Sequence, residues 1–396
     1  MIFYDPFRKE WYQQLSNENY VFGKTGLAIP FKKNLNEGSI SFQISCHDGN
    51  LLGPLIGIMT SRKNNKSLAG NGLLFKNIQK EVIQKGGLSF VFTPEGLGTK
   101  SIEGFCYLPD KDAWIKITVP FPHVVYNRIP FRQAEQTSEF QLAVNIFREK
   151  GIPFFNPSFL KKFDLYKLFK NDEDIGKYFP ETILINDEAL FRLFISKHRN
   201  VYLKPNTLSK GKGIYRLTVE QDGSLSLVGL SHQYSYRDLN EFLKERFAIL
   251  RKKHYIAQCA VSPALLNGER FDFRVLSHFQ NGEYLVTGVG IRQADKQNIT
   301  THLPNGGRLV PYSRVQNQQH DHFFQVIVNR CGELLSNKKG FFGEFSIDAG
   351  MTETGKYVIY EVNAKPMSFD EEEIEASRIQ NLCTLFFNLA GFKNPS

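Results

Sequence analysis

Two carboxylates and one amide stand close together in the C-terminal part of the sequence. Asp348 ends one apolar run, and Glu361 and Asn363 end the next run after a turn-rich segment. If the two runs form a hairpin whose turn centres on Thr354 and Gly355, Asp348 lies opposite Glu361, although a longer loop would shift this register. Asn363 shares a strand face with Glu361 in either case. Oxygen ligands of this kind suit Mg²⁺ that also contacts phosphate, and a cation would relieve the repulsion between the carboxylates; a solvated hairpin end is the alternative.

Lysines and glycines gather around residue 210. Lys204 ends a strand-like run, Pro205 follows, and the next segment is rich in both residue types. The candidates in that segment are Ser209, Lys210, Gly211, Lys212 and Gly213. Glycine lets backbone N–H groups approach a phosphate, and lysine adds a cationic donor. The segment lacks the spacing of a P-loop, so a plain hairpin turn and an exposed edge lysine are the alternatives.

An arginine inside an apolar run is a third candidate. Asp272 and Arg274 alternate with apolar residues, which places both on one face of the predicted strand. Such an arginine can bind a phosphate or a substrate carboxylate with its forked donors. A structural Asp–Arg pair explains the pattern equally well.

His320 and His322 lack a matching third ligand, which makes them the weakest candidates for a metal site.

The runs that carry these residues show alternating strand and helix patterns. Apolar residues at helical spacing predict helices over residues 71–84, 135–150, 156–169, 236–252 and 371–390. Apolar or alternating runs predict strands over residues 55–60, 88–93, 104–108, 123–126, 182–185, 200–204, 213–219, 224–229, 255–261, 270–278 and 284–291, followed by the hairpin 343–363. The strands and the helix before residue 127 form a small α/β unit. Residues 1–50 contain short mixed segments that predict no definite element.

Composition narrows the class of protein. A chain of 396 residues exceeds one compact core and predicts two or three domains. The five cysteines are scattered and form no CxxC pair, which predicts reduced thiols rather than disulfides or a zinc site. The sequence shows no membrane span and no signal peptide, so we expect a cytoplasmic protein. The net charge of +9 is spread along the chain, and we expect no sequence-specific nucleic-acid binding.

Taken in order, these motifs resemble those of the ATP-grasp superfamily, and specifically of the bacterial YheC/YheD family of endospore coat-associated proteins. The segments that carry the resemblance are Asn156–Phe163, Pro180–Thr182, Leu203–Pro205, Ser209–Ile214, Asp272–Val275, Pro304–Gly307, Phe345–Asp348 and Glu361–Pro366. The resemblance covers about Gly53 to the C-terminus and is strongest over residues 155–367. Each segment alone is moderately specific, and the shared order and spacing make the match strong.

The resemblance implies an α/β (α+β) protein with the ATP-grasp fold, in which two α+β subdomains grip ATP. It implies three parts along the chain. Residues 1–53 would form an N-terminal extension of uncertain fold, and residues 54–154 a small Rossmann-like α/β domain that precedes the ATP-grasp domain. Residues 155–396 would form the ATP-grasp domain itself, with a lid subdomain over about residues 180–260.

The resemblance also implies roles for individual residues in binding ATP and Mg²⁺. The residues expected to contact the nucleotide are the phosphate-binding lysines Lys162 and Lys204, the lid loop Ser209–Ile214, and the adenine-reading hinge Gln258, Cys259 and Ala260. The expected Mg²⁺ ligands are Asp348, Glu361 and Asn363. The residues expected to stabilise the transferred phosphate or to hold the acceptor are Arg274, Arg292 and Asn305. The sequence departs from many relatives in two respects. Residues 258–262 contain no acidic side chain to hold the ribose, and Lys161 stands before the first phosphate lysine where related ligases often have Asp.

In function, the resemblance implies an ATP-dependent ligase that joins a carboxylate to an amine or thiol through an acyl phosphate. The implied partners are an unidentified carboxylate, an amine or thiol acceptor, and spore coat proteins. The implied location is the cytoplasm, with association to the spore coat. The alternative is a structural or interaction protein of the spore coat that keeps the fold without ligase turnover.

Overall fold

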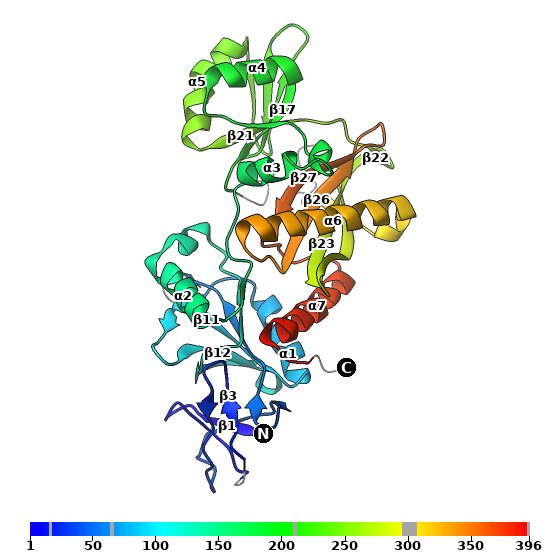
Figure 1. The fold of residues 1–396 in the computed structure, drawn as a ribbon. Helices are drawn as coiled ribbons and strands as arrows, with labels where there is room; N and C mark the ends of the chain where they lie inside the picture. The colour runs from blue at the N-terminus through cyan, green and yellow to red at the C-terminus, as the bar shows by residue number, and fades with distance from the viewer. Residues whose placement is uncertain (16–17, 64–66, 209–211, 295–306, 394–396) are drawn as a thin grey trace.

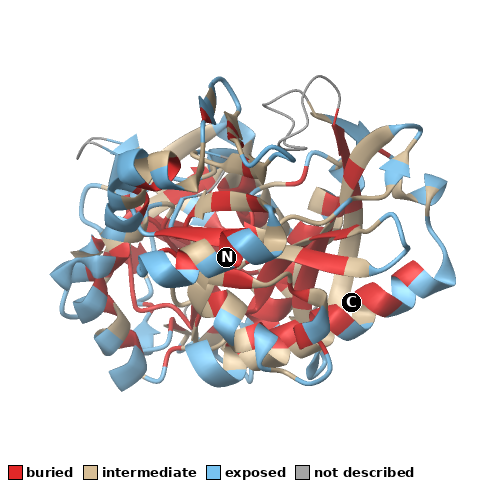
Figure 2. Cartoon of the chain, turned by 90° about the horizontal axis from the view of Figure 1, so that it is seen from above, coloured by how far each residue is buried: buried red, intermediate tan, exposed pale blue. Residues whose placement is uncertain are grey.

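Three six-stranded sheets form the body of the protein and follow one another along its long axis (Figure 1). The computed structural model describes residues 1–15, 18–63, 67–208, 212–294 and 307–393. Viewed from above, the buried residues concentrate in the strands, whereas the helices show exposed outer faces (Figure 2). Within the described ranges, no helix is both long and apolar enough to span a membrane.

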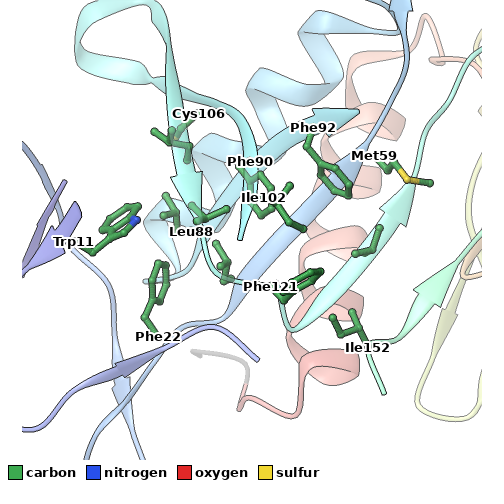
Figure 3. Close-up of a cluster of buried hydrophobic side chains, with 14 of the residues drawn as sticks. Trp11, Phe22, Met59, Leu88, Phe90, Phe92, Ile102, Cys106, Phe121 and Ile152 are labelled. Carbon is green, nitrogen blue, oxygen red and sulfur yellow. The ribbon is translucent and has the colours of Figure 1, made fainter. Parts of the chain in front are cut away.

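The N-terminal segments form two small sheets at one end of the molecule (Figure 1). Their strands are β1 (Ile2–Asp5), β2 (Glu10–Tyr12), β3 (Val21–Phe22), β4 (Leu27–Ala28), β5 (Ile40–Phe42), β6 (Cys46–His47) and β7 (Leu51–Leu52). Trp11 and Phe22 lie in the same hydrophobic cluster as Leu88, which belongs to the following sheet, and Phe121, which lies between two of its strands (Figure 3). These strands were not predicted because two to four residues are too few to show a hydrophobic period.

The first six-stranded sheet has the strand order β13-β12-β11-β8-β14-β15. Its strands are β8 (Leu55–Met59), β11 (Leu88–Leu97), β12 (Ile102–Leu108), β13 (Ala113–Val119), β14 (Val124–Asn127) and β15 (Phe154–Phe155), and a small hairpin of β9 (Arg62–Lys63) and β10 (Ser67–Leu68) follows β8. The strands β11, β8, β14 and β15 pair in parallel, while β12 and β13 pair antiparallel. All five residues of β8 are buried, as expected for a parallel strand with both faces covered. The Rossmann-like description of this part stays a prediction.

Helices from both ends of the chain cover this first sheet. Helix α1 (Gly72–Gln84) begins at Asn71, whose side chain accepts a hydrogen bond from Leu74 N and so caps the helix. Helix α2 (Ser138–Glu149) contacts β11. The C-terminal helix α7 (Glu372–Ala390) contacts α1 and shares a hydrophobic cluster with β8 (Figure 1). The predicted division of the chain near residue 154 stays a prediction.

The second sheet, called the distal sheet below, lies at the far end of the molecule from the N-terminus (Figure 1). Its strand order is β16-β21-β17-β18-β19-β20. Its strands are β16 (Thr182–Leu184), β17 (Asn200–Pro205), β18 (Tyr215–Val219), β19 (Leu225–Gly229), β20 (Gln233–Tyr236) and β21 (Tyr255–Cys259), and its helices are α4 (Glu188–His198) and α5 (Leu239–Lys252). Strands and helices of this sheet share a hydrophobic cluster of their own.

The third sheet, called the central sheet below, lies between the other two (Figure 1). Its strand order is β25-β24-β23-β26-β27, and β22 pairs with β23. Its strands are β22 (Leu265–Leu266), β23 (Glu269–Gln280), β24 (Glu283–Ala294), β25 (Gly307–Val310), β26 (Glu344–Met351) and β27 (Tyr357–Asn363), and its helices are α3 (Lys162–Lys170) and α6 (Gln318–Lys339).

The structure corrects three of the predicted helix starts. The helix predicted from residue 135 begins at Ser138. The helix predicted to open at Asn156 begins only at Lys162. Asn156 instead adopts a φ of 54° and is fully buried, and its Nδ2 donates to the carbonyl oxygens of Glu344 and Ala364 at 2.7 Å each. The helix predicted over residues 236–252 is also too long at its start, because Tyr236 ends strand β20.

Candidate functional site

One pocket lies between the distal sheet and the central sheet. Its walls come from α3, η3 (Gly176–Tyr178) and its following residue, β16, β17, β21 and β27. The lining residues are Lys162, Leu165, Tyr166, Phe169, Phe179, Thr182, Lys204, Ile256, Gln258, Tyr360, Glu361 and Val362. The pocket is partly open to solvent and has about 30 Å³ of space, which is room for very few water molecules. Four predicted site residues therefore meet in one pocket: Lys162, Lys204, Gln258 and Glu361.

Asn206 joins the two elements that carry the lysines. It follows β17 directly, and its side-chain oxygen accepts from Phe163 N at 2.9 Å while its carbonyl accepts from Lys162 N at 3.1 Å. These are two of the N–H groups that a helix leaves free at its start, so the end of β17 caps α3. These two hydrogen bonds hold the start of α3, which carries Lys162, beside the end of β17, which carries Lys204. Asn206 was not predicted, because nothing in the sequence shows that an asparagine after a strand caps a helix that precedes it in the chain.

The two lysines reach the pocket from opposite elements and already have partners there. Lys162 Nζ forms an ion pair with Glu361 Oε1. Lys204 is half-buried, and its Nζ donates to Gln258 Oε1 at 2.5 Å. Burial lowers the pKa of Lys204 to about 8, although the nearby Glu361 carboxylate opposes this shift. Lys204 therefore holds its proton weakly until a negative group comes close.

The predicted hinge lies on an inner strand of the distal sheet. β21 pairs with β16 on one side and β17 on the other. Cys259 N donates to Glu181 O at 2.8 Å, and Ala260 N donates to Asn200 O at 3.0 Å. These two N–H groups are therefore used within the protein. An adenine at this segment would have to meet other groups, such as backbone carbonyls or the Gln258 side chain.

The hairpin of β26 and β27 brings the predicted Mg²⁺ ligands together. Asp348 pairs with Glu361 across the two strands, as the sequence predicted. The register near the turn differs from the expected one, because Met351 pairs with Tyr357. A bulge after Asp348 then shifts the register by one residue, so that Asp348 pairs with Glu361. Asn363 Nδ2 donates to Asp348 Oδ2 at 3.3 Å.

Arg292 lies buried between two carboxylates. Its Nε donates to Asp272 Oδ1 at 3.0 Å, and its Nη2 donates to Asp348 Oδ1 at 3.1 Å. Burial alone would lower the pKa of Arg292, but Asp348 and Asp272 outweigh it and raise that pKa. The structure thus gives Asp272 an arginine partner on the neighbouring strand.

Arg274 takes a different role from the Asp–Arg pair considered from the sequence. Its guanidinium donates to the carbonyl oxygens of Met367 and Ser368 at 2.9 and 3.0 Å. It also lies over the Phe369 ring, 4.2 Å from the centroid. Arg274 therefore holds the backbone of Met367 and Ser368, which follow the predicted Mg²⁺ ligands in the chain.

The donor set of the hairpin fits Mg²⁺. Asp348 and Glu361 are carboxylates on directly paired residues, and Asn363 can add an amide oxygen. In the described part of the chain, no group of three or more His, Cys, Asp and Glu side chains is arranged to hold a metal ion. A hexacoordinate cation at this hairpin would therefore need the amide and further oxygens from its ligand or water.

Some predicted residues do not join this site or cannot be placed. Ser209, Lys210, Gly211 and Asn305 lie outside the described residues, as does the rest of the segment Pro304–Gly306. Lys212 is exposed. Gly213 has a φ of +71°, and its carbonyl accepts from the Tyr255 hydroxyl at 3.0 Å.

The weak metal candidate His320 has a structural environment. It lies in the first turn of α6, and its Nδ1 is 2.6 Å from the Tyr357 hydroxyl. Its ring packs against Phe273 and Phe324. A hydrogen-bonded histidine in an aromatic cluster is accounted for without a metal.

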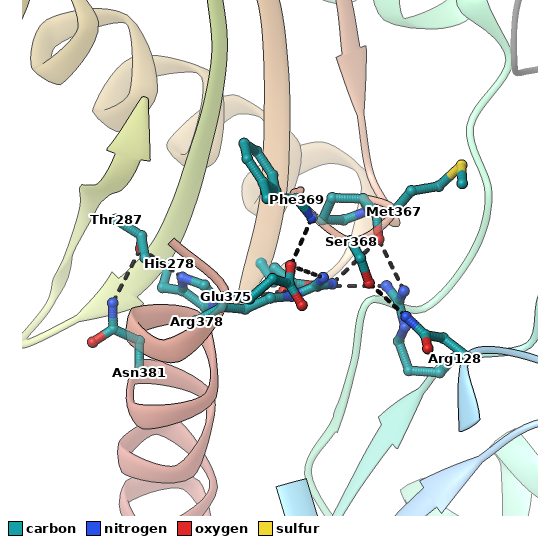
Figure 4. Close-up of polar contacts among 12 residues, drawn as sticks. Arg128, His278, Thr287, Met367, Ser368, Phe369, Glu375, Arg378 and Asn381 are labelled. Atoms are coloured by element: carbon teal, nitrogen blue, oxygen red, sulfur yellow. Dashed lines mark hydrogen bonds and ion pairs between the residues drawn. The ribbon is translucent and has the colours of Figure 1, made fainter. Parts of the chain in front are cut away.

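A buried polar network around Glu344 and Arg378 was not predicted, and Figure 4 shows part of it. Glu344 is fully buried and accepts from Arg378 Nε at 2.5 Å and from the Tyr126 hydroxyl at 2.6 Å. Burial would raise the pKa of Glu344, but Arg378 and its other partners hold it well below the ordinary range. Arg128 and Arg378 also donate to the carbonyl of Pro366, at 2.9 and 3.2 Å. The sequence signal that could have indicated this network is Glu344, a single glutamate inside the apolar run 341–347.

A second buried pair joins the 3-10 helix Arg132–Gln136, which follows β14, to the segment after Asn363. Lys365 forms an ion pair with Glu135, and both side chains are almost fully buried. Glu135 also accepts from Asn127 Nδ2 at 3.0 Å and Phe159 N at 2.7 Å. Burial lowers the pKa of Lys365 to about 8. Residues 364–369 are therefore held from both the segment that follows β14 and α7.

Comparison with known proteins identifies this arrangement. A family model of YheC/D-like ATP-grasp proteins matches residues 151–392. The chain belongs to the YheC/D-like ATP-grasp family. It is also similar to the endospore coat-associated protein YheD of Bacillus subtilis (strain 168), with 29% identity over 343 residues, which is 82% of this chain and 75% of YheD.

Solved structures show the same fold as this YheC/D-like chain. D-alanyl-alanine synthetase A from Vibrio cholerae O1 has a TM-score of 0.51 and 13% identity, covering 86% of this chain and 99% of the synthetase. D-cycloserine synthetase DcsG has a TM-score of 0.50 and 14% identity, covering 84% of this chain and 99% of DcsG. At this level of identity the likeness concerns the fold. The predicted ATP-grasp fold and YheC/YheD family are confirmed.

Proposed function

We propose that this YheC/D-like protein binds Mg·ATP and uses it to join a carboxylate to an amine or a thiol. The observation that carries the proposal is the pocket in which Lys162, Lys204, Gln258 and Glu361 meet between two sheets. Two proteins that share the fold are named as synthetases, which supports a ligase as the class of enzyme.

The two lysines are suited to bind the phosphates of ATP. Lys162 now pairs with Glu361, and Lys204 donates to the neutral amide of Gln258. A phosphate oxygen is a stronger acceptor than an amide for an ammonium group. A bound phosphate would also favour the charged form of Lys204 and raise its pKa from about 8.

The apolar part of the pocket suits the adenine ring. Ile256 comes from the distal sheet and Val362 from the central sheet, and both line the pocket. Because the N–H groups of Cys259 and Ala260 are already used, we propose that Gln258 and carbonyl oxygens of the strand read the adenine edge. The same geometry leaves the ribose without a carboxylate partner in residues 258–262.

Asp348, Glu361 and Asn363 would hold Mg²⁺ at the other end of the pocket. When bound there, the ion would neutralise charge on the phosphate oxygens during transfer. Lys162 would then move from Glu361 to phosphate, and Arg292 would keep Asp348 in place through its second contact to Asp272. Arg274 would hold the segment beside the acceptor through Met367 and Ser368.

The proposed reaction has two steps. An oxygen of the substrate carboxylate bonds to the γ-phosphorus of ATP while the bond to the bridging oxygen breaks, which gives an acyl phosphate and ADP. The amine or thiol then bonds to the acyl carbon and loses a proton, and inorganic phosphate leaves. Positioning and charge neutralisation, rather than covalent catalysis by a side chain, supply most of the rate in such phosphoryl transfers.

A coat-associated structural role is the second candidate. The relative YheD is described as endospore coat-associated, and spore coat proteins are the partners that this description suggests for the present chain. The pocket also balances its own charges without a ligand, through Lys162 and Glu361. A protein that kept the fold for structure alone could retain that ion pair.

Acceptor-dependent release of ADP distinguishes the two candidates. The purified protein would be incubated with ATP, Mg²⁺ and a panel of amino acids, short peptides and thiols, and ADP would be measured. A ligase gives ADP that depends on a particular acceptor, and Asp348→Ala and Glu361→Ala abolish it. Glu353→Ala is the matched control, because Glu353 is an exposed carboxylate in the turn of the same hairpin.

The structural role predicts a different set of results. Mg·ATP would bind without acceptor-dependent turnover, even when extracts of sporulating cells supply the acceptor. ADP release that persists unchanged in Asp348→Ala would also contradict the proposed site.

A further inference from the structure

A second cavity lies on the opposite face of the distal sheet, under helix α5. Its lining residues are Leu203, Tyr215, Leu227, Phe242, Arg246, Ile249, Leu250, Lys253 and Tyr255. Its volume is about 180 Å³, compared with about 30 Å³ for the pocket between the sheets. The two cavities share strands but no residue.

Strand alternation separates the two cavities. Leu203 and Lys204 are neighbours on β17, and Tyr255 and Ile256 are neighbours on β21. In each pair the first residue lines the cavity under α5 and the second lines the pocket between the sheets. Successive side chains of a strand point to opposite faces, so the cavity under α5 is a separate site.

The interior of the cavity is apolar. Leu203, Leu227, Phe242 and Leu250 are buried members of the hydrophobic cluster of the distal sheet. The cavity is partly open to solvent, and these four residues form its inner wall. An apolar cavity of about 150 Å³ is large enough to take up benzene. The cavity therefore suits an apolar group about the size of a phenyl ring.

The rim of the cavity is cationic and partly apolar. Arg246 is half-buried, and its guanidinium lies 4.3 Å from the centroid of the Tyr234 ring, with Nε donating to the Tyr236 hydroxyl at 2.6 Å. These contacts hold the guanidinium in one place. Lys253 is exposed at the end of α5, and Ile249 between them is 46% exposed.

The charge of α5 as a whole has the same sign as the rim. Residues 239–253 contain five lysines and arginines and two glutamates. A negative group at the rim would therefore meet a helix whose side chains carry a net positive charge. Charge complementarity thus adds a negative group to the apolar group that the interior suits.

We propose that the distal sheet carries a second ligand site, under α5, for a small carboxylic acid with an aryl tail. The tail occupies the cavity lined by Leu203, Leu227 and Phe242, and the carboxylate binds Arg246 and Lys253 at the rim. This site is independent of ATP turnover. Its ligand binds whether or not the pocket between the sheets is a ligase site.

Titration with 4-phenylbutyrate tests this proposal without any nucleotide. Calorimetry and ligand-observed NMR should show saturable binding to the full-length protein. 4-Phenylbutanol, which lacks the charge, and butyrate, which lacks the ring, should each bind at least about tenfold more weakly. Equal binding of the acid and the alcohol, or no saturable binding of the acid, would overturn the proposal.

Two variants locate the binding. Leu227→Phe fills part of the cavity and should abolish binding, while Arg246→Gln should weaken it about tenfold by removing the charged donor. Lys244→Gln is the matched control, because Lys244 is exposed on the same helix and does not line the cavity. If Leu227→Phe does not fold, the affinities of Arg246→Gln and Lys244→Gln for 4-phenylbutyrate are compared instead. Equal affinities of those two variants would contradict the proposed rim.

Discussion

At the residue scale, the charge of Lys204 should control how ATP binding depends on pH. Burial lowers the pKa of Lys204 to about 8 in the free protein, and a bound phosphate would raise it. Binding is therefore coupled to proton uptake above pH 8. The affinity for Mg·ATP should fall as pH rises from 8, by up to about tenfold per pH unit.

Calorimetry of Mg·ATP between pH 7 and pH 9.5 measures this dependence. Lys204→Gln removes the titrating group, so its weaker binding should change little over the same range. A wild-type affinity that stays constant up to pH 9.5 would show that Lys204 does not carry the effect.

The residues also show where sequence reasoning succeeds and where it stops. The apolar runs before Asp348 and Glu361 were enough to predict that the two carboxylates face each other. The sequence could not show the bulge that restores their pairing, because a bulge is a local shift of one residue against a partner strand. Nor could it show that Arg274 binds Met367 and Ser368, about ninety residues further along the chain.

At the element scale, helix α7 is fixed to the rest of the protein by a buried ion pair. Arg378 and Glu344 are both fully buried. Replacing Arg378 by Met would leave the Glu344 charge without its main partner, and breaking a buried pair in this way costs about 3–5 kcal/mol. We expect Arg378→Met to lower the free energy of unfolding by that amount in chemical denaturation.

Arg192→Met is the control for this experiment. Arg192 pairs with Glu188 four residues earlier on α4, and both side chains are substantially exposed. Surface pairs of this kind contribute less than about 1 kcal/mol. If Arg378→Met unfolded with the same small change as Arg192→Met, the network around Glu344 would not stabilise the fold.

The contact between α6 and strand β24 gives another prediction. A Cβ atom added at Gly332 would lie 2.2 Å from the Tyr284 ring, which cannot be accommodated without movement. Alanine favours a helix over glycine by up to about 1 kcal/mol, but overpacking costs about 1–3 kcal/mol. We expect Gly332→Ala to lower the melting temperature.

Gly72→Ala is the matched substitution. Gly72 begins α1, and an added Cβ would meet no atom within 4 Å. This variant should melt at or slightly above the wild-type temperature. An unchanged melting temperature in Gly332→Ala would mean that Tyr284 moves aside freely.

Elements were predicted well where a hydrophobic period runs without interruption. Helix α1 and strands β17 and β19 lie within one or two residues of their predicted bounds. Helix α6 was not predicted, although Phe324, Val328 and Leu335 lie on one buried face, because charged and polar residues interrupt its sequence. Asn156 misled the prediction of α3, since an asparagine before proline resembles a helix start but here bridges two distant strands.

At the scale of the whole molecule, the candidate site depends on how the central and distal sheets meet. Lys204 and Gln258 come from the distal sheet, and Glu361 comes from the central sheet. The pocket between the sheets has room for very few water molecules, so we expect the two sheets to move apart when ATP binds. Such hinge motion between lobes is common in enzymes that close over a substrate.

The sequence predicted the ATP-grasp fold through the order of its motifs, but not the contacts that hold the three sheets together. Several of those contacts join residues separated by more than 200 positions, such as Glu135 with Lys365 and Tyr126 with Glu344. Hydrophobic periodicity reports on neighbours along the chain. It carries no information about partners this far apart.

Calorimetric titration of the full-length protein with Mg·ATP tests the central claim most directly. We predict saturable binding to the wild type, weakened about tenfold or more in Lys162→Ala and Lys204→Ala, because each variant loses a charged contact to phosphate. Lys212 is exposed and does not line the pocket, so Lys212→Ala should reduce the affinity for Mg·ATP less than either of these variants. Absence of both heat and thermal stabilisation at millimolar Mg·ATP in the wild type would contradict the account.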